Sequence, residues 1–475
     1  MLQNNTKIIA TLGPASTSEE NLEALIKEGV AIFRLNFSHG NHQDHKSSID
    51  KIIRLNEKLG THVGILADLQ GPKLRIGQIE NNALLLKEGD IITITNEECI
   101  GTIEKIYMSY DSFADDLKVG EMVLVDDGKL QFEVIEVIPE KDVVRLKCIF
   151  GGVLSSNKGV NLPDTEVKLP SLTEKDLEDL AFIVTQPVNW VALSFVRKAE
   201  DVEDLIHRIE LAGHYAKVIS KIEKPEAIKN IDAIIKASNG IMIARGDLGV
   251  EMPIEKLPTI QKMIVAKCIQ RSRPVIVATQ MMDSMITNPS PTRAEVTDVA
   301  NAVLDGADAV MLSAETSVGK HPVKVVEAMN RIIAEAEQHY NFQIKKPLAS
   351  DKSSTFISDV VCFNAAKTAE DISATAIIGL TVSGYTAFKT SCYRPKCPIY
   401  IFSNAVHMLG TLNLVWGVHC YYYNENRSTD ETIDDLVQIL KENKKVKLGD
   451  FVVNTGTMPL FKKGRTNMMK VTEVD

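Results

Sequence analysis

The chain opens with short apolar runs that alternate with stretches of helical periodicity. Runs rich in β-branched residues at Lys7–Leu12, Val30–Phe37 and Val63–Leu69 predict strands. Amphipathic stretches at Glu19–Lys27 and Gln43–Leu59 predict helices between them. Strands and helices that alternate with such short links indicate a parallel sheet covered by helices.

A segment without helical periodicity interrupts this alternation. From Gly77 to about Asn157 there is no convincing helix, and a turn signal at Asp126-Asp127-Gly128 separates two short strands. The strands predicted here are Ile91–Ile94, Met122–Val125, Gln131–Val134 and Val143–Leu146. We expect a small β-barrel domain, inserted after the third strand and occupying residues 73–157.

The alternation of strands and helices then resumes. Helices are predicted at Glu174–Phe182, Ala199–Leu211 and Val323–Glu337. The predicted strands are Trp190–Val196, Lys217–Ile222, Ile241–Ala244, Val275–Thr279 and Ala309–Leu312. Three strands before the insert and five after it make eight, which indicates a closed (β/α)₈ TIM barrel over residues 1–72 and 158–342. An open, doubly wound sheet is the alternative that the pattern leaves open.

A further α/β domain is predicted after a linker at Lys345–Ser350. Helices are expected at Ile357–Thr368 and Ile433–Glu442. Strands are expected at Ala376–Leu380, Ile399–Ile401 and Asp450–Val453. This domain should span residues 350–475 and have a core of its own.

Charge and composition exclude several classes of function. The formal net charge of −10 argues against nucleic acid or an anionic membrane as the main partner. No apolar run approaches the ~20 residues needed to span a bilayer, and the first residues do not resemble a signal peptide. The 7 cysteines include no CxxC pair, so we expect reduced thiols and a cytoplasmic protein.

Candidate chemistry gathers where the predicted strands end. Arg34, Asn36 and Ser38 share one face of the second strand and suit a phosphate, although an ion-paired Arg with turn-forming neighbours would give the same pattern. The third strand ends in Asp68, followed by Lys73 and Arg75, which alone is a weak signal.

The later strand ends add a cation, two acids and a hydroxyl. Lys221 and Glu223 share a face, as a cationic stabiliser beside a metal ligand would, or as a buried ion pair would. Gly246 allows close backbone approach to an anion, and Asp247 is a second candidate metal ligand. Thr279 is polar in an apolar strand, which also fits a capping role.

Five segments carry a resemblance to a known family. They are Ile32–Gly40, Ser220–Glu223, Ala244–Glu251, Ala278–Met281 and Pro291–Val303. In these segments, and over nearly its full length, the chain resembles the pyruvate kinases. The resemblance implies phosphoryl transfer from phosphoenolpyruvate to ADP, giving pyruvate and ATP in the last step of glycolysis. It also implies a lid role for the insert, a regulatory role for the last domain and a homotetramer.

The resemblance assigns roles residue by residue. Arg34 would hold the transferring phosphoryl group, and Lys221 would neutralise the charge on it in flight. Glu223 and Asp247 would hold Mg²⁺, or Mn²⁺ in its place. The implied substrate contacts are Arg34, Asn36, Ser38, Asp68, Gly246, Asp247 and Thr279, with Thr279 near the carbon that is protonated. The implied nucleotide contacts are Pro14, His39, Arg75 and Lys158.

The third strand departs from the potassium-dependent pattern of the family. Members that need K⁺ carry Thr, Lys and Glu where this chain has Leu69, Gln70 and Lys73. The K⁺-dependent pattern supplies oxygens for the ion from positions matching Asn36, Ser38, Asp68 and Leu69, and we expect one ligand to be missing here because Leu69 has no side-chain oxygen. We also expect the Lys73 ammonium to replace the monovalent cation, so that K⁺ is not required. The chain then resembles the bacterial K⁺-independent subgroup.

The last domain contains a candidate effector loop. Thr381, Ser383, Gly384 and Thr386 resemble the phosphate loop through which the family binds a sugar phosphate or AMP. Trp416 stands where many relatives place an Arg, which leaves the identity of the effector open.

Two other functions remain in view. Another Mg²⁺-dependent barrel enzyme that acts on pyruvate-like acids, such as a carbon–carbon lyase, would leave the insert, Arg34, Arg75 and Lys158 without a role. A catalytically silent paralogue would not need the intact set of charged residues at the strand ends.

Overall fold

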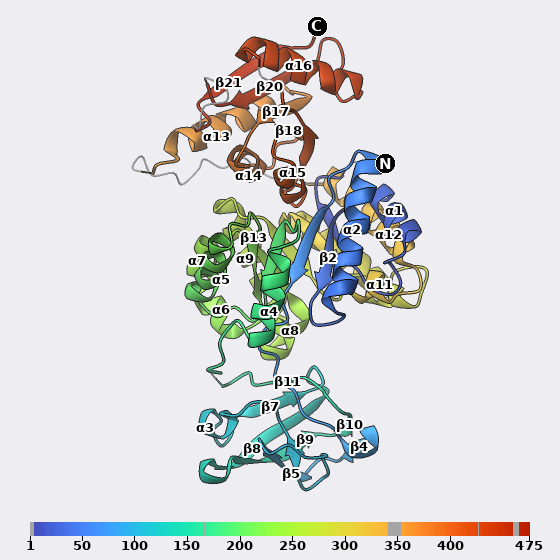
Figure 1. Ribbon diagram of the computed structural model, residues 1–475, viewed down its shortest axis with the longest axis vertical. Helices are drawn as coiled ribbons and strands as arrows, with labels where there is room; N and C mark the ends of the chain where they lie inside the picture. The colour runs from blue at the N-terminus through green and yellow to red at the C-terminus, as the bar shows by residue number, and fades with distance from the viewer. Residues whose placement is uncertain (1–3, 166, 341–352, 426, 459–464) are drawn as a thin grey trace.

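Three domains follow one another along the long axis of the molecule (Figure 1). The computed structural model describes residues 4–165, 167–340, 353–425, 427–458 and 465–475. The C-terminal domain, the barrel and the insert are stacked in that order, with the insert at the opposite end of the barrel from the C-terminal domain. The predicted linker at Lys345–Ser350 lies outside the described residues, as do the proposed domain limits at 1, 342 and 350. No helix in the described part of the chain is long and apolar enough to cross a bilayer.

The central domain is a closed parallel barrel, as predicted. Its strands are β1 (Lys7–Thr11), β2 (Val30–Asn36), β3 (Gly64–Asp68), β12 (Trp190–Leu193), β13 (Lys217–Ile222), β14 (Gly240–Ala244), β15 (Val275–Ala278) and β16 (Ala309–Leu312). Their order around the barrel, β1-β16-β15-β14-β13-β12-β3-β2, excludes the open doubly wound sheet. Most strand residues are buried on both faces, which is why these strands read as apolar runs without clean alternation.

Helices surround the barrel, and short ones such as α8 (Arg245–Glu251) follow directly where the strands end. They are α1 (Glu19–Lys27), α2 (His42–Leu59), α4 (Glu174–Ile183), α5 (Ala199–Leu211), α6 (Pro225–Lys229), α7 (Ile231–Ala237), α8 (Arg245–Glu251), α9 (Leu257–Gln270), α10 (Arg293–Asp305), α11 (Ala314–Ser317) and α12 (Pro322–Gln338). Local signals set several ends: Ser18 caps α1 by accepting a hydrogen bond from the Asn21 amide, and Gly60 ends α2 in the left-handed region at φ 64°.

The barrel interior is filled by side chains, so its two ends are chemically separate. Ile9, Ile32, Leu66 and Trp190 belong to one interior cluster, and Leu414 of the C-terminal domain joins that cluster. The C-terminal domain therefore closes the end of the barrel where the strands begin. The opposite end, where the strands finish, is left for chemistry.

The insert is a small β-barrel, and the chain segment that leads into it, at Arg75 and Ile76, joins the two edges of its main sheet. Its elements are β4 (Leu84–Leu86), β5 (Ile91–Thr95), β6 (Ile106–Tyr107), α3 (Phe113–Asp116), β7 (Met122–Val125), β8 (Leu130–Ile138), β9 (Val143–Phe150), β10 (Gly152–Leu154) and β11 (Val160–Asn161). Six of the strands form one sheet, in the order β11-β7-β8-β9-β5-β6. Arg75 bridges to Gly159 beside β11, and Ile76 bridges to Met108 beside β6, so these two residues join the two edges of that sheet.

Two features of the insert differ from the sequence prediction. The sheet continues past residue 157, because β11 pairs with β7 and Leu162 still packs into the core of the insert. The short helix α3 was not predicted, because four residues cannot display a helical period.

The C-terminal domain is a five-stranded α/β unit. Its elements are α13 (Phe356–Asp371), β17 (Ala376–Leu380), α14 (Tyr385–Ser391), β18 (Ile399–Ser403), α15 (Val406–Leu412), β19 (Val418–Tyr422), α16 (Thr429–Glu442), β20 (Phe451–Gly456) and β21 (Met468–Glu473). The strand order is β19-β18-β17-β20-β21, and only β21 runs antiparallel to its neighbour.

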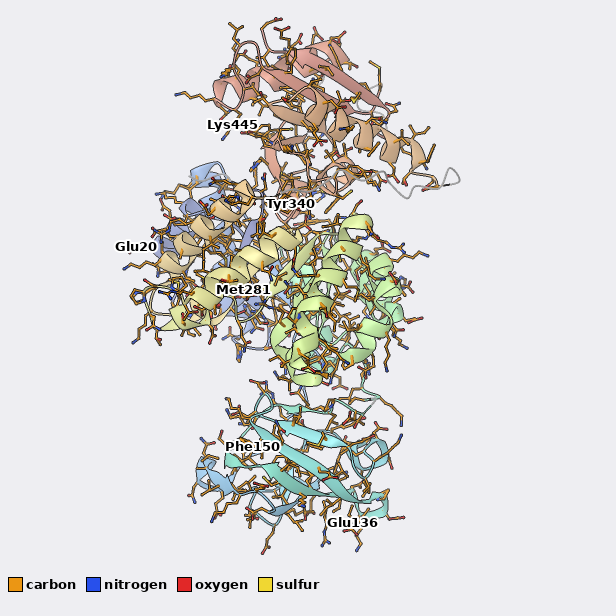
Figure 2. The ribbon with its side chains drawn as sticks, turned by 180° about the vertical axis from the view of Figure 1, so that it is seen from behind. Glu20, Glu136, Phe150, Met281, Tyr340 and Lys445 are labelled. Atoms are coloured by element: carbon orange, nitrogen blue, oxygen red, sulfur yellow. The ribbon has the colours of Figure 1, made fainter. Side chains whose placement is uncertain are left out.

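A buried ion pair joins this domain to the barrel. Arg394 lies 2.9 Å from Asp308, which directly precedes β16, and the guanidinium stacks over Trp416 with its carbon 5.0 Å from the ring centroid. Tyr340 lies at the same boundary, with its ring 6.0 Å from that of Trp416 (Figure 2). Trp416 is buried in the interface, so at this position it stabilises the contact between the two domains.

Candidate active site

A lysine and two carboxylates form the centre of the strand-end face. The Lys221 Nζ lies 3.2 Å from Asp68 Oδ1 and 3.1 Å from Glu223 Oε1. It also donates a hydrogen bond of 2.7 Å to the Ser194 hydroxyl. These residues come from the ends of β3, β13 and the segment after β12, so the closed barrel is what brings them together.

Arg34 completes this cluster from β2. Its Nε donates to Asp68 Oδ2 over 2.6 Å, and a terminal nitrogen donates to the Thr11 hydroxyl over 3.1 Å. Asp68 is therefore shared by two cations, one on each oxygen. The predicted partners Asn36 and Ser38 lie on the same strand end, where Asn36 Oδ1 accepts a hydrogen bond from the Ser38 amide.

Burial and charge act against each other on the ionisable groups of this cluster. Burial alone would lower the pKa of Lys221, but the carboxylates of Asp68 and Glu223 outweigh it and hold that pKa above its ordinary value. Burial would raise the pKa of Asp68, whereas Lys221 and Arg34 hold it below the usual range. For Glu223, burial dominates and raises the pKa, with a further contribution from the negative charge of Asp247. The site therefore holds Lys221 as a charged ammonium. The negative charge of ionised Glu223 is only partly offset by its neighbours.

Helix α8 presents an amide to the same face. The Gly246 N–H donates to Thr279 Oγ1 over 2.7 Å, and that hydroxyl donates to the Ala278 carbonyl. Thr279 and Gln280 have φ angles of 70° and 54°, in the left-handed region that a β-branched residue rarely adopts. Such strain at two successive residues is typical of a functional site.

Two residues that hold this geometry were not singled out from the sequence. Arg245 forms two hydrogen bonds of 2.6 Å with Asp298 of α10 and donates to the Thr279 carbonyl, so it anchors α8 against β15. Ser194 orients Lys221 while its hydroxyl donates to the Leu69 carbonyl. A polar residue directly after the apolar strand Trp190–Leu193 was the available signal for Ser194.

The acids of the site fit a divalent cation. No group of three or more His, Cys, Asp or Glu with metal-binding geometry occurs among the described residues. Glu223 and Asp247 nevertheless repel each other electrostatically, and a cation between them would relieve that repulsion. Mg²⁺ commonly binds one or two carboxylates and takes its other ligands from substrate phosphates and water, which is the donor set available here.

Lys73 lies near this acid pair. Its Nζ is 3.7 Å from Asp247 Oδ1, and both side chains are about one-third exposed. Leu69 is 1% exposed and packs into the apolar layer between the strands and the outer helices. Its side chain therefore points away from the site. A Thr hydroxyl at this position would face the same apolar layer, so the side chain at position 69 does not decide whether K⁺ can bind.

The predicted nucleotide contacts fall into two groups. Pro14 and His39 line a cavity of about 610 Å³ that Asn36 also lines, so the first group borders the cluster around Arg34. Arg75 and Lys158 lie on the insert side: Arg75 donates to the Asn157 carbonyl, and Lys158 lies 2.8 Å from Asp126. Both cations therefore interact with residues of the insert itself, Arg75 with the Asn157 carbonyl and Lys158 with Asp126.

The candidate effector loop precedes α14. Thr381 Oγ1 accepts a hydrogen bond from the Gly384 amide, and Gly384 adopts a φ of 79°. Thr386 is buried and its hydroxyl lies 2.6 Å from that of Thr466. Ser383 is exposed, so the four residues differ in what they can offer to a ligand.

Comparisons with known proteins agree with this geometry. Residues 3–326 match the model of the pyruvate kinase barrel domain, and residues 359–472 match that of the pyruvate kinase alpha/beta domain. The chain is 42% identical to a pyruvate kinase of Geobacillus stearothermophilus over 99% of this chain and 80% of that protein. It is 41% identical to one of Clostridium perfringens over 99% of both.

The fold agrees as well. The crystal structure of a pyruvate kinase from Cryptosporidium parvum superimposes with a TM-score of 0.92 at 34% identity, covering 100% of this chain and 97% of that one. Two family models, full-length relatives and a shared three-domain fold lead to one conclusion: the chain belongs to the pyruvate kinase family.

Proposed function

We propose that this phosphotransferase moves the phosphoryl group of phosphoenolpyruvate to ADP with the help of Mg²⁺ and without K⁺. The observation that carries the proposal is the Lys221 ammonium, held within 3.2 Å of two buried carboxylates at the centre of the barrel mouth. A charge fixed in this way needs no reorganisation when negative charge spreads over a transferring phosphoryl group.

The neighbouring residues divide the remaining work. Arg34 would bind the phosphoryl oxygens from the side of β2, with Asn36, Ser38 and Asp68 lining the same strand ends. The Gly246 amide would orient the substrate carboxylate. The P–O bond to the enol oxygen breaks, a P–O bond to the terminal phosphate of ADP forms, and the enolate takes a proton on its methylene carbon near Thr279.

Glu223 and Asp247 would hold a divalent cation, which would supply positive charge to offset that of the substrate phosphates. Mg²⁺ is the proposed ion, with Mn²⁺ as a substitute. Asp247 is more exposed than Glu223, so the site is open to the solvent side from which substrates arrive.

The nucleotide would lie between the barrel and the insert. Pro14 and His39 border the 610 Å³ cavity, which has room for a base, and Arg75 and Lys158 would reach the phosphates once the insert swings toward the barrel. In that position the insert would act as a lid that excludes water.

Potassium independence is proposed on the position of Lys73. Its ammonium is 3.7 Å from a proposed metal ligand, Asp247. Two cations 4 Å apart repel by about 4 kcal/mol at an effective dielectric near 20, so the ammonium would exclude a monovalent ion from its surroundings.

The remaining proposals concern the whole protein. We infer a cytoplasmic homotetramer that a sugar phosphate or AMP activates through Thr381, Ser383, Gly384 and Thr386. The cysteines are free and largely buried, which supports the cytoplasm as the compartment, because disulfides are rare there.

The test of the proposed reaction is its stoichiometry. Purified protein, phosphoenolpyruvate, ADP and Mg²⁺ should give one ATP for each pyruvate, and omission of ADP should stop pyruvate formation. Pyruvate release that does not depend on ADP would favour a lyase or a phosphatase, and the absence of any turnover would favour a silent paralogue.

A further inference from the structure

One face of α8 contacts both chain segments that lead into the insert. Asp247 lies 3.7 Å from Lys73 on the first hinge segment, and Glu251 accepts a hydrogen bond of 2.7 Å from Asn161 on the second. Positions 247 and 251 are four residues apart, so their side chains lie on the same side of the helix. The turn between β7 and β8 approaches the same helix, since a Cβ on Gly128 would lie 3.7 Å from Val250.

Glu251 is a buried carboxylate with two donors on one oxygen. It is 3% exposed, and its Oε1 accepts from Asn161 Nδ2 and, over 2.5 Å, from Lys224 Nζ. Its Oε2 has no hydrogen-bond partner among the described residues. Lys224 directly follows Glu223, one proposed metal ligand, and α8 carries the other, Asp247.

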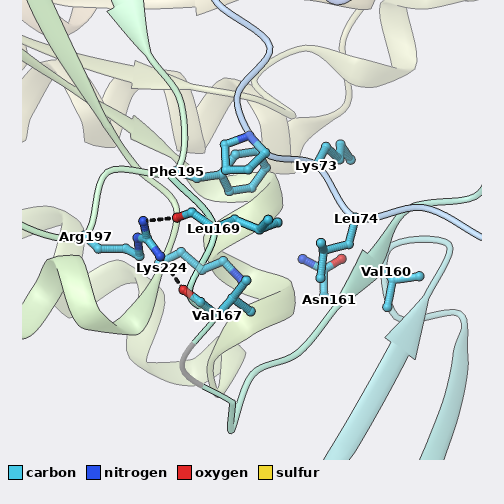
Figure 3. Close-up of a pocket in the computed structure, with 10 residues that line it drawn as sticks. Lys73, Leu74, Val160, Asn161, Val167, Leu169, Phe195, Arg197 and Lys224 are labelled. Carbon is cyan, nitrogen blue, oxygen red and sulfur yellow. Dashed lines mark hydrogen bonds between the residues drawn. The ribbon is translucent and has the colours of Figure 1, made fainter. Parts of the chain in front are cut away.

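A small cavity and a second barrel contact lie beside this hydrogen bond. Asn161, Lys224, Phe195 and Leu74 are among the residues that line a small cavity of about 30 Å³ beside this contact (Figure 3). Across the cavity, Arg197 donates to the backbone carbonyls of two residues of the return segment, Val167 and Leu169. The return segment is therefore held against the barrel beyond Asn161, while Asn161 itself lies in β11, the last strand of the insert.

We propose that Glu251 is a positioning residue that couples the angle of the insert to the spacing of the two proposed metal ligands. The proposal rests on the proposed function, because it takes Glu223 and Asp247 to be those ligands. A shift of Asn161 displaces the Glu251 carboxylate, which is too deeply buried to exchange its partner for water. Since α8 is less than two turns long, that displacement moves Asp247 as well, and through Lys224 it reaches Glu223.

The test changes the neutral partner on the insert side. Glu251→Ala would leave the Lys224 ammonium buried and unpaired, and the variant could fail to fold for that reason. Asn161→Ala removes only an amide, and Asn96→Ala, in the insert but away from the hinge, is the matched control. The readout is binding of Mn²⁺ to the full-length protein without substrates, from the electron paramagnetic resonance signal of free Mn²⁺, with the thermal midpoint Tm recorded for each variant.

Asn161→Ala should raise the Kd for Mn²⁺ about tenfold, a factor that corresponds to about 1.4 kcal/mol, whereas Asn96→Ala should leave it unchanged. Wild-type Mn²⁺ binding in Asn161→Ala would overturn the coupling. Asp247→Asn separates the two hypotheses: if it also binds Mn²⁺ normally, the ligand assignment in the proposed function is wrong.

Discussion

At the scale of single residues, the site depends on charges that compensate one another in pairs. Lys221 is surrounded by Asp68 and Glu223, and Arg34 takes the second oxygen of Asp68. Isolated buried charges would be costly, but cations and carboxylates that lie within ion-pair distance offset part of that cost and fix one another in place. A substrate phosphate that enters this cluster meets cations whose positions are already set.

Replacement of Lys221 should affect turnover far more than binding. Lys221→Met removes a charge that we assign to the transition state, so kcat should fall by several orders of magnitude with little change in KM for phosphoenolpyruvate. Steady-state kinetics at saturating ADP measure both constants. Because the variant leaves Asp68 and Glu223 facing each other, Tm should be recorded beside the kinetics. A raised KM with kcat intact would contradict the assignment.

The proposed role of Lys73 can be tested by whether its replacement makes the activity depend on K⁺. In a K⁺-free buffer, Lys73→Glu should be nearly inactive, because the fixed ammonium is lost and a new carboxylate faces Asp247. KCl should restore part of that activity, since Asn36, Ser38 and Asp68 still offer oxygens. Lys73→Met is the matched control, which should lose activity but regain less with KCl. A Lys73→Glu enzyme as active as the wild type in K⁺-free buffer would show that Lys73 is only a surface residue.

At the scale of elements, most of the fold could be predicted from the sequence, as could the side chains that gather where the barrel strands end. Apolar runs located the ends of the barrel strands to within three residues, because burial is a local signal. Helical periods located the ends of the five barrel helices that were given ranges to within one residue. Strand β21 was missed because it is an exposed edge strand with alternate residues in solvent, added antiparallel to an otherwise parallel sheet.

The contacts between elements could not be predicted. The Arg245–Asp298 pair joins residues on two different helices, and the Asn161–Glu251 contact joins the insert to the barrel. Such pairs form only where two folded elements meet in space. A single sequence gives no signal for which distant residues will come together in this way. The side chain of Leu69 illustrates the same limit, since it packs toward the apolar layer rather than the site.

Two substitutions in the candidate effector loop should have different effects, one on activation and the other on stability. Ser383→Ala removes an exposed hydroxyl and should abolish activation by a sugar phosphate or AMP without lowering Tm. Thr386→Ala should lower Tm, because its hydroxyl is paired with Thr466 in a buried contact. Initial rates at subsaturating phosphoenolpyruvate, with and without effector, provide the readout. Activation that survives Ser383→Ala would exclude this hydroxyl as a ligand.

At the scale of the whole molecule, the two ends of the barrel have different tasks. The C-terminal domain seals the end where the strands begin, with Leu414 in the interior cluster and Arg394 paired to Asp308. The insert faces the other end, where the strands finish. The barrel strands therefore connect the C-terminal domain to the end of the barrel that carries the candidate site.

The interface between the barrel and the C-terminal domain should give the protein a pH-dependent stability. Lys7 is buried and donates to the Val418 carbonyl, and burial lowers its pKa from 10.5 to about 8. Between pH 8 and 10.5 the unfolded state binds more protons at this residue, so stability should rise with pH by on the order of 1 kcal/mol per unit. The Tm of the wild type should increase from pH 8 to 9.5 more than that of Lys7→Met. Parallel Tm curves for the two proteins would contradict this account.

One assay tests the central claim most directly: the initial rate of ADP-dependent pyruvate formation in a tetramethylammonium buffer with Mg²⁺, measured before and after addition of KCl at constant ionic strength. We predict a full rate before the addition, which changes less than twofold afterwards, because Lys73 already supplies the monovalent charge beside Asp247. A rate that rises tenfold or more with KCl, or pyruvate formation that does not require ADP, would contradict the account.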